Sequence, residues 1–442
     1  MEMNLQAHDQ HQGGYGRFGV ECKKQLQALG VVDYGDVGHG PTNMEDFNKE
    51  IDAPAKVTGE ALWLSTPPAM RGRYAGQHTS LFTMWESTEM PAGFRENLHC
   101  ADTVFVPSLQ NQELFSRFHD DVRYIPLGVD PVAWRYRPRT TPSSDFNFLT
   151  AGYGPRKNCI EVARAFDKVF SGRPIGKGPV PRLYVRSRDD LDFPNVYSIS
   201  SQLSTKEEID LYAQAHCYVS GARGEGWGLM PSQAIAQGLP AILGDAHGHA
   251  AFAALGIPID TAPISAARAT FWGDGGEWWE PDFEQMCEAM RDVYSHYDEY
   301  AAVADISSKM FLDQFTWAKT AEQLIFQLPS LFEEGNQDAE WEPVEPHLYK
   351  IRVNRTCSYS VNGKVNLFEP GRDYWKIADL KRQIIQNGQL DLACWDPHEF
   401  GLSARDAEAL TDANERCPTC HQRFNIDLTP QELVDAEIRG GA

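Results

Sequence analysis

The sequence lacks any apolar run long enough to span a membrane, and its start, MEMNLQAHDQHQGG, lacks the basic and apolar segments of a signal peptide. Positive charge is also scarce: 40 lysines and arginines face 62 acidic residues, for a formal net charge of -22. Because lysine and arginine drive binding to phosphate backbones, this balance disfavours a surface that binds nucleic acid in general. We expect a cytoplasmic protein without a membrane anchor, which could bind nucleic acid only through a local basic cleft.

Closely spaced cysteines are few as well. Of nine cysteines, only Cys417 and Cys420 form a local motif, and most of the others stand alone in apolar stretches, as free buried thiols do in a reducing compartment. The chain has 442 residues, of which 42% are hydrophobic. It is therefore long enough for two or three globular domains with substantial cores.

Short apolar runs alternate with helical patterns twice along the chain. In the first half, MNLQAH precedes a glycine loop and the helical RFGVECKKQLQALG, and SLFTMW, ADTVFVPS and VRYIPLG follow later. The second half repeats the alternation from FNFLTAGYG to PAILG, and Ser204 and Glu207 have capping-box spacing at the start of one helix. This pattern predicts two parallel-sheet α/β domains, residues 1–138 and 139–333, joined at GVDPVAWRYRPRTTPSS.

The last part of the chain changes character. Residues 311–333 have helical spacing, and the acidic, proline-containing segment 334–346 is expected to be an exposed linker. Residues 347–442 would form a small accessory domain. In it, Asn362-Gly363 between alternating runs predicts a β-hairpin.

The tail motif CPTCHQRF has three interpretations. Haem attachment belongs to exported proteins, and a redox-active C-x-x-C would need thioredoxin-like surroundings. A structural Zn²⁺ site needs two further ligands, which the nearby CWDPH supplies. The expected zinc ligands are Cys394, His398, Cys417 and Cys420, with Cys357 or His421 as substitutes. Free thiols in a small domain are the alternative.

Among three glycine-containing loops, GARGEGWGLMPSQAIAQG is the most specific, because it sets Glu225 among Gly224, Gly226 and Gly228 just before a helix. In open α/β sheets, ligands bind beyond the carboxyl ends of strands, where helix N-termini offer free amides. Glu225 is thus expected on a tight turn facing a cleft. A helix-capping acidic loop is the structural alternative.

The other two loops carry weaker signals. In GYGPRKN, Arg156 and Lys157 follow a strand and precede a helix, so two cations and a helix N-terminus converge on a place suited to a diphosphate. A solvated basic turn is the alternative there. The loop HQGGYGRFG, residues 11–19, joins the first strand to the first helix without the pattern of a nicotinamide-binding fingerprint.

In their order along the chain, GGYGRFG, FTMWESTEMP, VPS, IPLGVD, GYGPRKN, GEGWGLMPSQAIAQGLPAI and FTWAKTAEQL resemble the family-4 retaining glycosyltransferases of the GT-B fold. The resemblance covers roughly residues 1–333. It implies two Rossmann-like domains facing a cleft, and a C-terminal helix around Trp317 that crosses back to the first domain. It also implies a UDP- or GDP-sugar donor and transfer without a metal ion.

The resemblance assigns roles to the matched residues. Glu225 would orient the donor-sugar hydroxyls, and Lys157, with Arg156, would neutralise the leaving diphosphate. The glycine-loop amides would lie close to the sugar and phosphate, and Gly14 would approach the phosphate from the opposite domain. The donor-binding set implied in this way is Gly13, Gly14, Gly226, Trp227, Gly228, Leu229 and Gln233.

Two positions depart from the family pattern. Gln233 stands where the family has a second glutamate that holds the nucleotide ribose, so its uncharged contact should be weaker. Trp85 and Glu86 stand where many members have a histidine. We expect Glu86 near the reacting centre, binding sugar or acceptor, with a helix cap as its structural alternative.

The resemblance implies transfer with retention, although Glu86 as a general base would permit inversion. For the acceptor, viral enzymes that glycosylate hydroxymethylated bases in DNA resemble this arrangement, and Arg135, Arg137 and Arg139 could meet a DNA backbone. A small metabolite, a cell-wall precursor or a protein side chain are alternative acceptors. A catalytically silent sugar-binding module is the alternative from another class.

Overall fold

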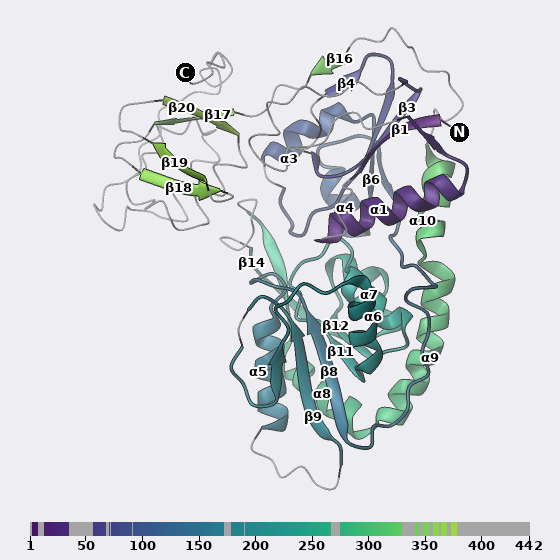
Figure 1. Ribbon diagram of the computed structural model, residues 1–442, viewed down its shortest axis with the longest axis vertical. Coiled ribbons are helices and arrows are strands. Elements are labelled where there is room, and N and C mark those ends of the chain that lie inside the picture. The colour runs from purple at the N-terminus through teal and green to yellow at the C-terminus, as the bar shows by residue number, and fades with distance from the viewer. Residues whose placement is uncertain are drawn as a thin grey trace.

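The computed structural model describes residues 2–7, 13–34, 56–67, 70, 72–90, 92–171, 178–189, 191–266 and 275–328, together with five later strands between residues 341 and 377. Two parallel-sheet domains lie one above the other in Figure 1, and the long helix α9 (Tyr297–Gln314) runs beside the second of them. The predicted α/β architecture is therefore confirmed.

The N-terminal domain contains a six-stranded sheet of order β2-β1-β3-β5-β6-β7, with every pair parallel. Its central strands β3, β5 and β6 are buried along most of their length, as the apolar runs predicted. The strands are β1 (Glu2–Ala7), β2 (Val32–Asp33), β3 (Glu60–Leu64), β5 (His78–Phe82), β6 (Thr103–Val106) and β7 (Val122–Tyr124). The helices are α1 (Gly13–Ala28), α3 (Ala92–Asn97) and α4 (Leu109–Phe115).

The second domain repeats the plan, with a parallel sheet of order β10-β9-β8-β11-β12-β13. Its strands are β8 (Asp145–Ala151), β9 (Val180–Arg186), β10 (Val196–Ser198), β11 (Cys217–Val219), β12 (Ala241–Gly244) and β13 (Ile257–Ile259). Its helices include α5 (Cys159–Phe170), α6 (Thr205–Gln214), α7 (Leu229–Ala236) and α8 (Phe283–Ser295). The antiparallel hairpin β14 (Thr261–Ser265) and β15 (Glu277–Pro281) is added between β13 and α8.

Local sequence signals explain how these helices begin and which face they bury. The predicted capping box is present, because Ser204 accepts from the Glu207 amide and the Glu207 carboxylate accepts from the Ser204 amide. Helix α5 is amphipathic and buries Val162 and Phe166 against the sheet. As predicted, the following cysteines are free and buried: Cys22, Cys100, Cys159, Cys217 and Cys287.

The return segment is two helices, not the single helix predicted over 311–333. Helix α9 ends at Gln314, and α10 (Trp317–Gln327) begins after Thr316, whose side chain caps it. The helix is interrupted there because the backbone around Thr316 pairs with Val129 of the first domain. Helix α10 then packs on α1, where Trp317 lies 6.2 Å from Phe18 between ring centroids.

Two further predictions need correction. The glycine segment 11–19 was predicted to be a loop, but α1 already begins at Gly13, whose φ of +83° suits glycine. The segment 334–346 is not an unpaired linker throughout, because β16 (Trp341–Pro343) pairs with β4 (Gly72–Tyr74). Backbone pairing does not depend on side-chain polarity, so the acidic composition gave no sign of it.

In the accessory region the predicted hairpin is present. Strands β18 (Cys357–Val361) and β19 (Lys364–Phe368) pair antiparallel on either side of Asn362-Gly363. A second antiparallel pair joins β17 (Leu348–Arg352) to β20 (Asp373–Ile377). In the part of the chain that the structure describes, no helix is long and apolar enough to cross a membrane.

Candidate active site

The glutamate loop lies between β11 and α7, at the carboxyl edge of the second sheet. Gly228, just before α7, has a φ of +110°, a conformation that a side chain would strain. The carbonyl of Glu225 accepts a hydrogen bond of 2.9 Å from the amide of Gly248. The Glu225 side chain is almost fully buried, so its carboxylate needs nearby partners.

Those partners are the two cations that precede α5. Arg156 Nη1 donates to Glu225 Oε2 at 3.2 Å and to the carbonyl of Gly224 at 2.5 Å, and Lys157 Nζ donates to Glu225 Oε1. Because β8 and β11 are parallel neighbours, their carboxyl ends meet, which brings together residues 68 positions apart. The sequence signals at GYGPRKN and GEGWG thus form one cluster.

This cluster sets the charge of its members. Burial alone would raise the pKa of Glu225, but the charges of Lys157 and Arg156 outweigh it and hold that pKa at about 2. Burial lowers the pKa of Lys157, while the Glu225 carboxylate opposes the shift. The carboxylate is therefore ionised at neutral pH and fixed between two cations.

Glu86 faces this cluster from the first domain, on the loop after β5. Its Oε1 lies 3.5 Å from Arg156 Nη2, so one arginine contacts carboxylates of both domains. The neighbouring Trp85 is buried, and its indole nitrogen donates to Ser87 Oγ at 2.8 Å. Trp85 therefore anchors the loop while Glu86 reaches the domain boundary.

The two domains meet tightly at this loop. A Cβ added at Gly224 would lie 2.1 Å from the carbonyl oxygen of Glu86, and one added at Gly226 would lie 2.6 Å from the Met84 side chain. The hairpin β14–β15 also contacts the first-domain loop that carries Glu86, since the Glu277 amide donates to Thr88 Oγ1 at 2.8 Å. In the glutamate loop, Gly224 and Gly226 are therefore required by the close approach of the first domain.

The remaining predicted donor residues take different positions. Gly13 and Gly14 are exposed in the first turn of α1. Leu229 is partly exposed at the start of α7, and Gln233 is buried further along that helix. The Trp227 side chain is buried and packs 5.1 Å from Phe252 between ring centroids.

A buried histidine pair behind the glutamate loop was not predicted. The rings of His247 and His249 lie 4.4 Å apart, and His249 contacts Gly228 closely enough that a Cβ there would lie 2.6 Å from its ring. Burial lowers the pKa of His249 to about 4, so both rings are neutral at pH 7. The HGH triplet after β12 is the sequence feature from which this pair could have been predicted.

A second unpredicted feature is a group of charged residues that joins the domains. Arg17 of α1 donates to Glu208 of α6 at 2.5 Å, and Arg186 at the end of β9 pairs with the same carboxylate. Glu208 is buried. Its partners are 191 and 22 positions away in sequence, too far for local patterns to reveal.

The expected zinc ligands Cys394, His398, Cys417 and Cys420 lie outside the described residues. Among the described residues, no group of three or more candidate ligands could hold a metal ion.

One arginine expected at a DNA backbone contacts the protein itself. The Arg139 guanidinium donates to the carbonyls of Tyr212, Ala213, Ala215 and Gln237. These contacts within the protein would compete with the expected contact to a DNA backbone, which stays a prediction.

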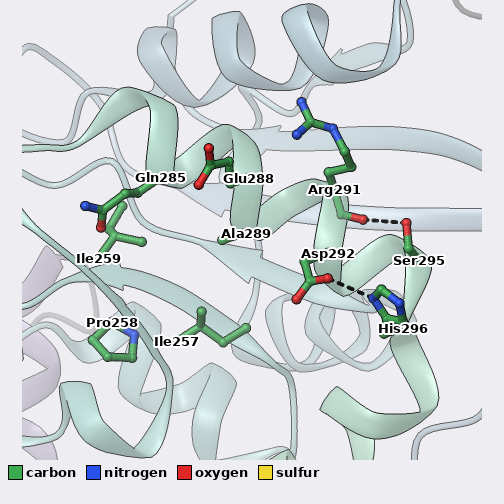
Figure 2. A pocket seen from close by; sticks show the side chains of 10 residues that line it. All are labelled: Ile257, Pro258, Ile259, Gln285, Glu288, Ala289, Arg291, Asp292, Ser295 and His296. Carbon is green, nitrogen blue, oxygen red and sulfur yellow. Dashed lines mark hydrogen bonds and ion pairs between the residues drawn. The ribbon is translucent and has the colours of Figure 1, made fainter.

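Figure 2 shows a pocket of about 540 Å³ elsewhere, along β13 and α8. Its charged side chains include Asp292, which contacts His296 at 2.8 Å. None of the predicted site residues lines it; the lining residues are Ile257, Pro258, Ile259, Gln285, Glu288, Ala289, Arg291, Asp292, Ser295 and His296. The candidate active site therefore remains the cluster around Glu225.

Two Rossmann-like parallel-sheet domains, with a C-terminal pair of helices that returns to the first domain, place the protein in the GT-B class. Among solved structures, sucrose-phosphate synthase from Thermosynechococcus elongatus has a TM-score of 0.52 at 13% identity, over 74% of this chain and 97% of that one. A glycosyltransferase from Rickettsia africae has 0.52 at 12%, over 74% and 97%. Anabaena HepE, in complex with UDP and glucose, has 0.50 at 12%, over 75% and 100%.

At the level of sequence, residues 202–324 match the family described as "Family 4 Glycosyltransferase in conflict systems". No curated protein matches the chain significantly. The matched range contains Glu225 and α7, the part of the resemblance that was most specific. The GT-B fold and the resemblance to family-4 glycosyltransferases are thereby confirmed.

Proposed function

We propose that this glycosyltransferase moves a sugar from a nucleotide-sugar donor to an acceptor hydroxyl at the boundary of the two domains. The observation that carries the proposal is the cluster of Arg156, Lys157 and Glu225, which Glu86 faces from the first domain. A UDP-sugar is the first donor to test, because Anabaena HepE has the same fold and was solved with UDP and glucose.

The cations account for departure of the nucleotide. When the bond between the anomeric carbon and the phosphate oxygen breaks, negative charge grows on the diphosphate, and Arg156 and Lys157 supply fixed positive charge there. Glu225, held by the same cations, would accept hydrogen bonds from the sugar hydroxyls. We propose that this side-chain charge suffices without a metal ion, so that activity persists in a chelator.

The acceptor step completes the reaction. The acceptor oxygen forms the new bond to the anomeric carbon on the face that the diphosphate leaves, and the acceptor proton passes to the departing phosphate oxygen. This path retains the anomeric configuration. If the acceptor oxygen instead attacked the face opposite the departing diphosphate while Glu86 took its proton as a general base, the configuration would invert. The anomeric configuration of the product therefore decides the role of Glu86.

Donor hydrolysis without acceptor tests the leaving-group assignment. Lys157→Met should reduce release of nucleoside diphosphate by about 10²- to 10³-fold, the usual cost of losing one preorganised group that stabilises charge. Lys168→Met is the matched control, because Lys168 also pairs with a glutamate but is half exposed on the outer face of α5. Unchanged hydrolysis in Lys157→Met would refute the assignment.

For the acceptor, we propose hydroxymethylated DNA as the first substrate to test. Arg139 is occupied by backbone carbonyls and Arg137 is half-buried, so the exposed Arg135 is the most accessible of the three arginines to DNA. Arg135→Ala should then weaken DNA glycosylation and make its loss with rising salt less steep, because one phosphate contact is removed. Transfer to a small metabolite, a cell-wall precursor or a protein, with none to DNA, would replace this acceptor while leaving the donor site intact.

A further inference from the structure

An exposed aromatic side chain stands beside the cation cluster. Tyr153 lies between Gly152 and Gly154 in the turn after β8, and 63% of its surface is exposed. The guanidinium carbon of Arg188, from the turn after β9, lies 5.2 Å from the centre of its ring. Exposed aromatic residues are common on protein surfaces, so the position of Tyr153 next to the cation cluster, and not its exposure alone, suggests a role.

Polar contacts hold the two turns together. The amide of Gly154 donates to Asp189 Oδ2 at 3.3 Å, and Ser187 Oγ donates to the same carboxylate oxygen at 2.9 Å. The Lys157 side chain packs against Gly152, where an added Cβ would lie 2.6 Å from it. Tyr153 and Arg188 are therefore fixed relative to each other and to the cation that would meet the diphosphate.

The strand order places these groups in a row. In the sheet, β8 lies between β11 and β9, so the groups at the carboxyl edge follow the sequence Glu225, then Arg156 and Lys157, then Tyr153 and Arg188. Neighbouring strands lie about 4.8 Å apart, so this row spans roughly 10 Å. A nucleotide sugar has its three parts in the same order: sugar, diphosphate and nucleoside.

We infer that Tyr153 and Arg188 form a platform on which the donor nucleobase stacks. The inference rests on the proposed function, which assigns the diphosphate to Arg156 and Lys157. Aromatic rings and guanidinium groups bind bases by their faces, and such stacking tolerates every base because each has a π-face. The platform strengthens binding of the nucleoside without selecting its base, and it acts even though Gln233 lacks the charge of a glutamate.

Comparing the binding of UDP and GDP with the binding of inorganic diphosphate isolates the contribution of the platform. In calorimetric titrations, Tyr153→Ala should weaken binding of UDP and of GDP by at least about tenfold, because loss of one stacking partner has that order of effect. Binding of inorganic diphosphate should not change. Tyr153→Phe should keep the affinity of the wild type, and Arg188→Ala should repeat the effect of Tyr153→Ala independently.

A matched control lies on the same sheet. Tyr197 is also exposed and also has an arginine over its ring, since the Arg182 guanidinium carbon lies 6.0 Å from the ring centre. Arg182 lies within β9 and Tyr197 within β10, not in the turns at the carboxyl edge. Tyr197→Ala should leave binding of UDP and of diphosphate unchanged.

The outcomes separate the two proposals. If the wild type binds UDP and diphosphate but Tyr153→Ala and Arg188→Ala bind UDP as tightly, the platform is refuted and the diphosphate site stands. If Tyr153→Ala weakens diphosphate as much as UDP, Tyr153 acts on the turn and not on the base, which also refutes the platform. If the wild type binds neither UDP, GDP nor diphosphate, the proposed function fails together with the inference.

Discussion

The ion pair between Lys157 and Glu225 should stabilise the folded protein measurably. The pKa of Glu225 falls from 4.5 to about 2 on folding, and each unit corresponds to 1.36 kcal/mol, so the ionised carboxylate contributes about 3 kcal/mol at neutral pH. Arg156 supplies part of this effect, and burial of the Lys157 charge opposes it. Lys157→Met should therefore lower the free energy of unfolding by about 2 kcal/mol at pH 7.

The direction of the pKa shift of Glu225 determines how its contribution to stability changes with pH. Because the folded pKa of Glu225 is depressed, its contribution is fully present above about pH 4.5 and is lost as the pH falls through about 2. The gap between wild type and Lys157→Met should thus shrink as the pH is lowered. Urea denaturation at neutral and acidic pH measures it, with Lys168→Met as the control that should match the wild type at both. A Lys157→Met variant as stable as the wild type at pH 7 would refute the reasoning.

Three further predictions concern neighbouring contacts. Glu86→Gln should tighten binding of UDP several-fold in calorimetry yet slow transfer, because Arg156 loses a competing carboxylate; weaker UDP binding would contradict this. Gly224→Ala should reduce kcat/KM far more than Gly226→Ala, because the new Cβ at position 224 meets backbone, whereas the one at position 226 meets a movable side chain. Equal losses of kcat/KM in the two variants would count against the tight domain contact. Arg139→Ala should cost about 3 kcal/mol in urea denaturation, and a loss below about 1 kcal/mol would show its carbonyl contacts to be weak.

The sequence predicted those parts of the fold and site that depend on local patterns. Alternating apolar runs and helical periods are local, and they located the strands and helices of both domains. The glycines around Glu225 and the basic pair at Arg156 and Lys157 were likewise visible as loops after strands. Their meeting could be expected because carboxyl ends of parallel strands share one edge.

What the sequence could not predict depends on contacts between distant segments. The pairing of Glu208 with Arg17 joins residues of two domains, and no local pattern marks it. The break between α9 and α10 arises because Val129 pairs with the backbone around Thr316. The contacts of Arg139 were missed for the same reason, since its carbonyl partners lie at the C-terminal ends of α6 and α7, which only the folded chain brings near.

The central claim is that Glu225 and its two cations hold a nucleotide-sugar donor. Thermal unfolding of the wild type and of Glu225→Ala, with a panel of UDP- and GDP-sugars and the free diphosphates, tests it most directly. We predict that at least one nucleotide sugar stabilises the wild type, by about 2.7 kcal/mol at one hundred times its Kd, and that Glu225→Ala loses this stabilisation. No stabilisation of the wild type by any nucleotide sugar or diphosphate would contradict the claim and favour a catalytically silent module.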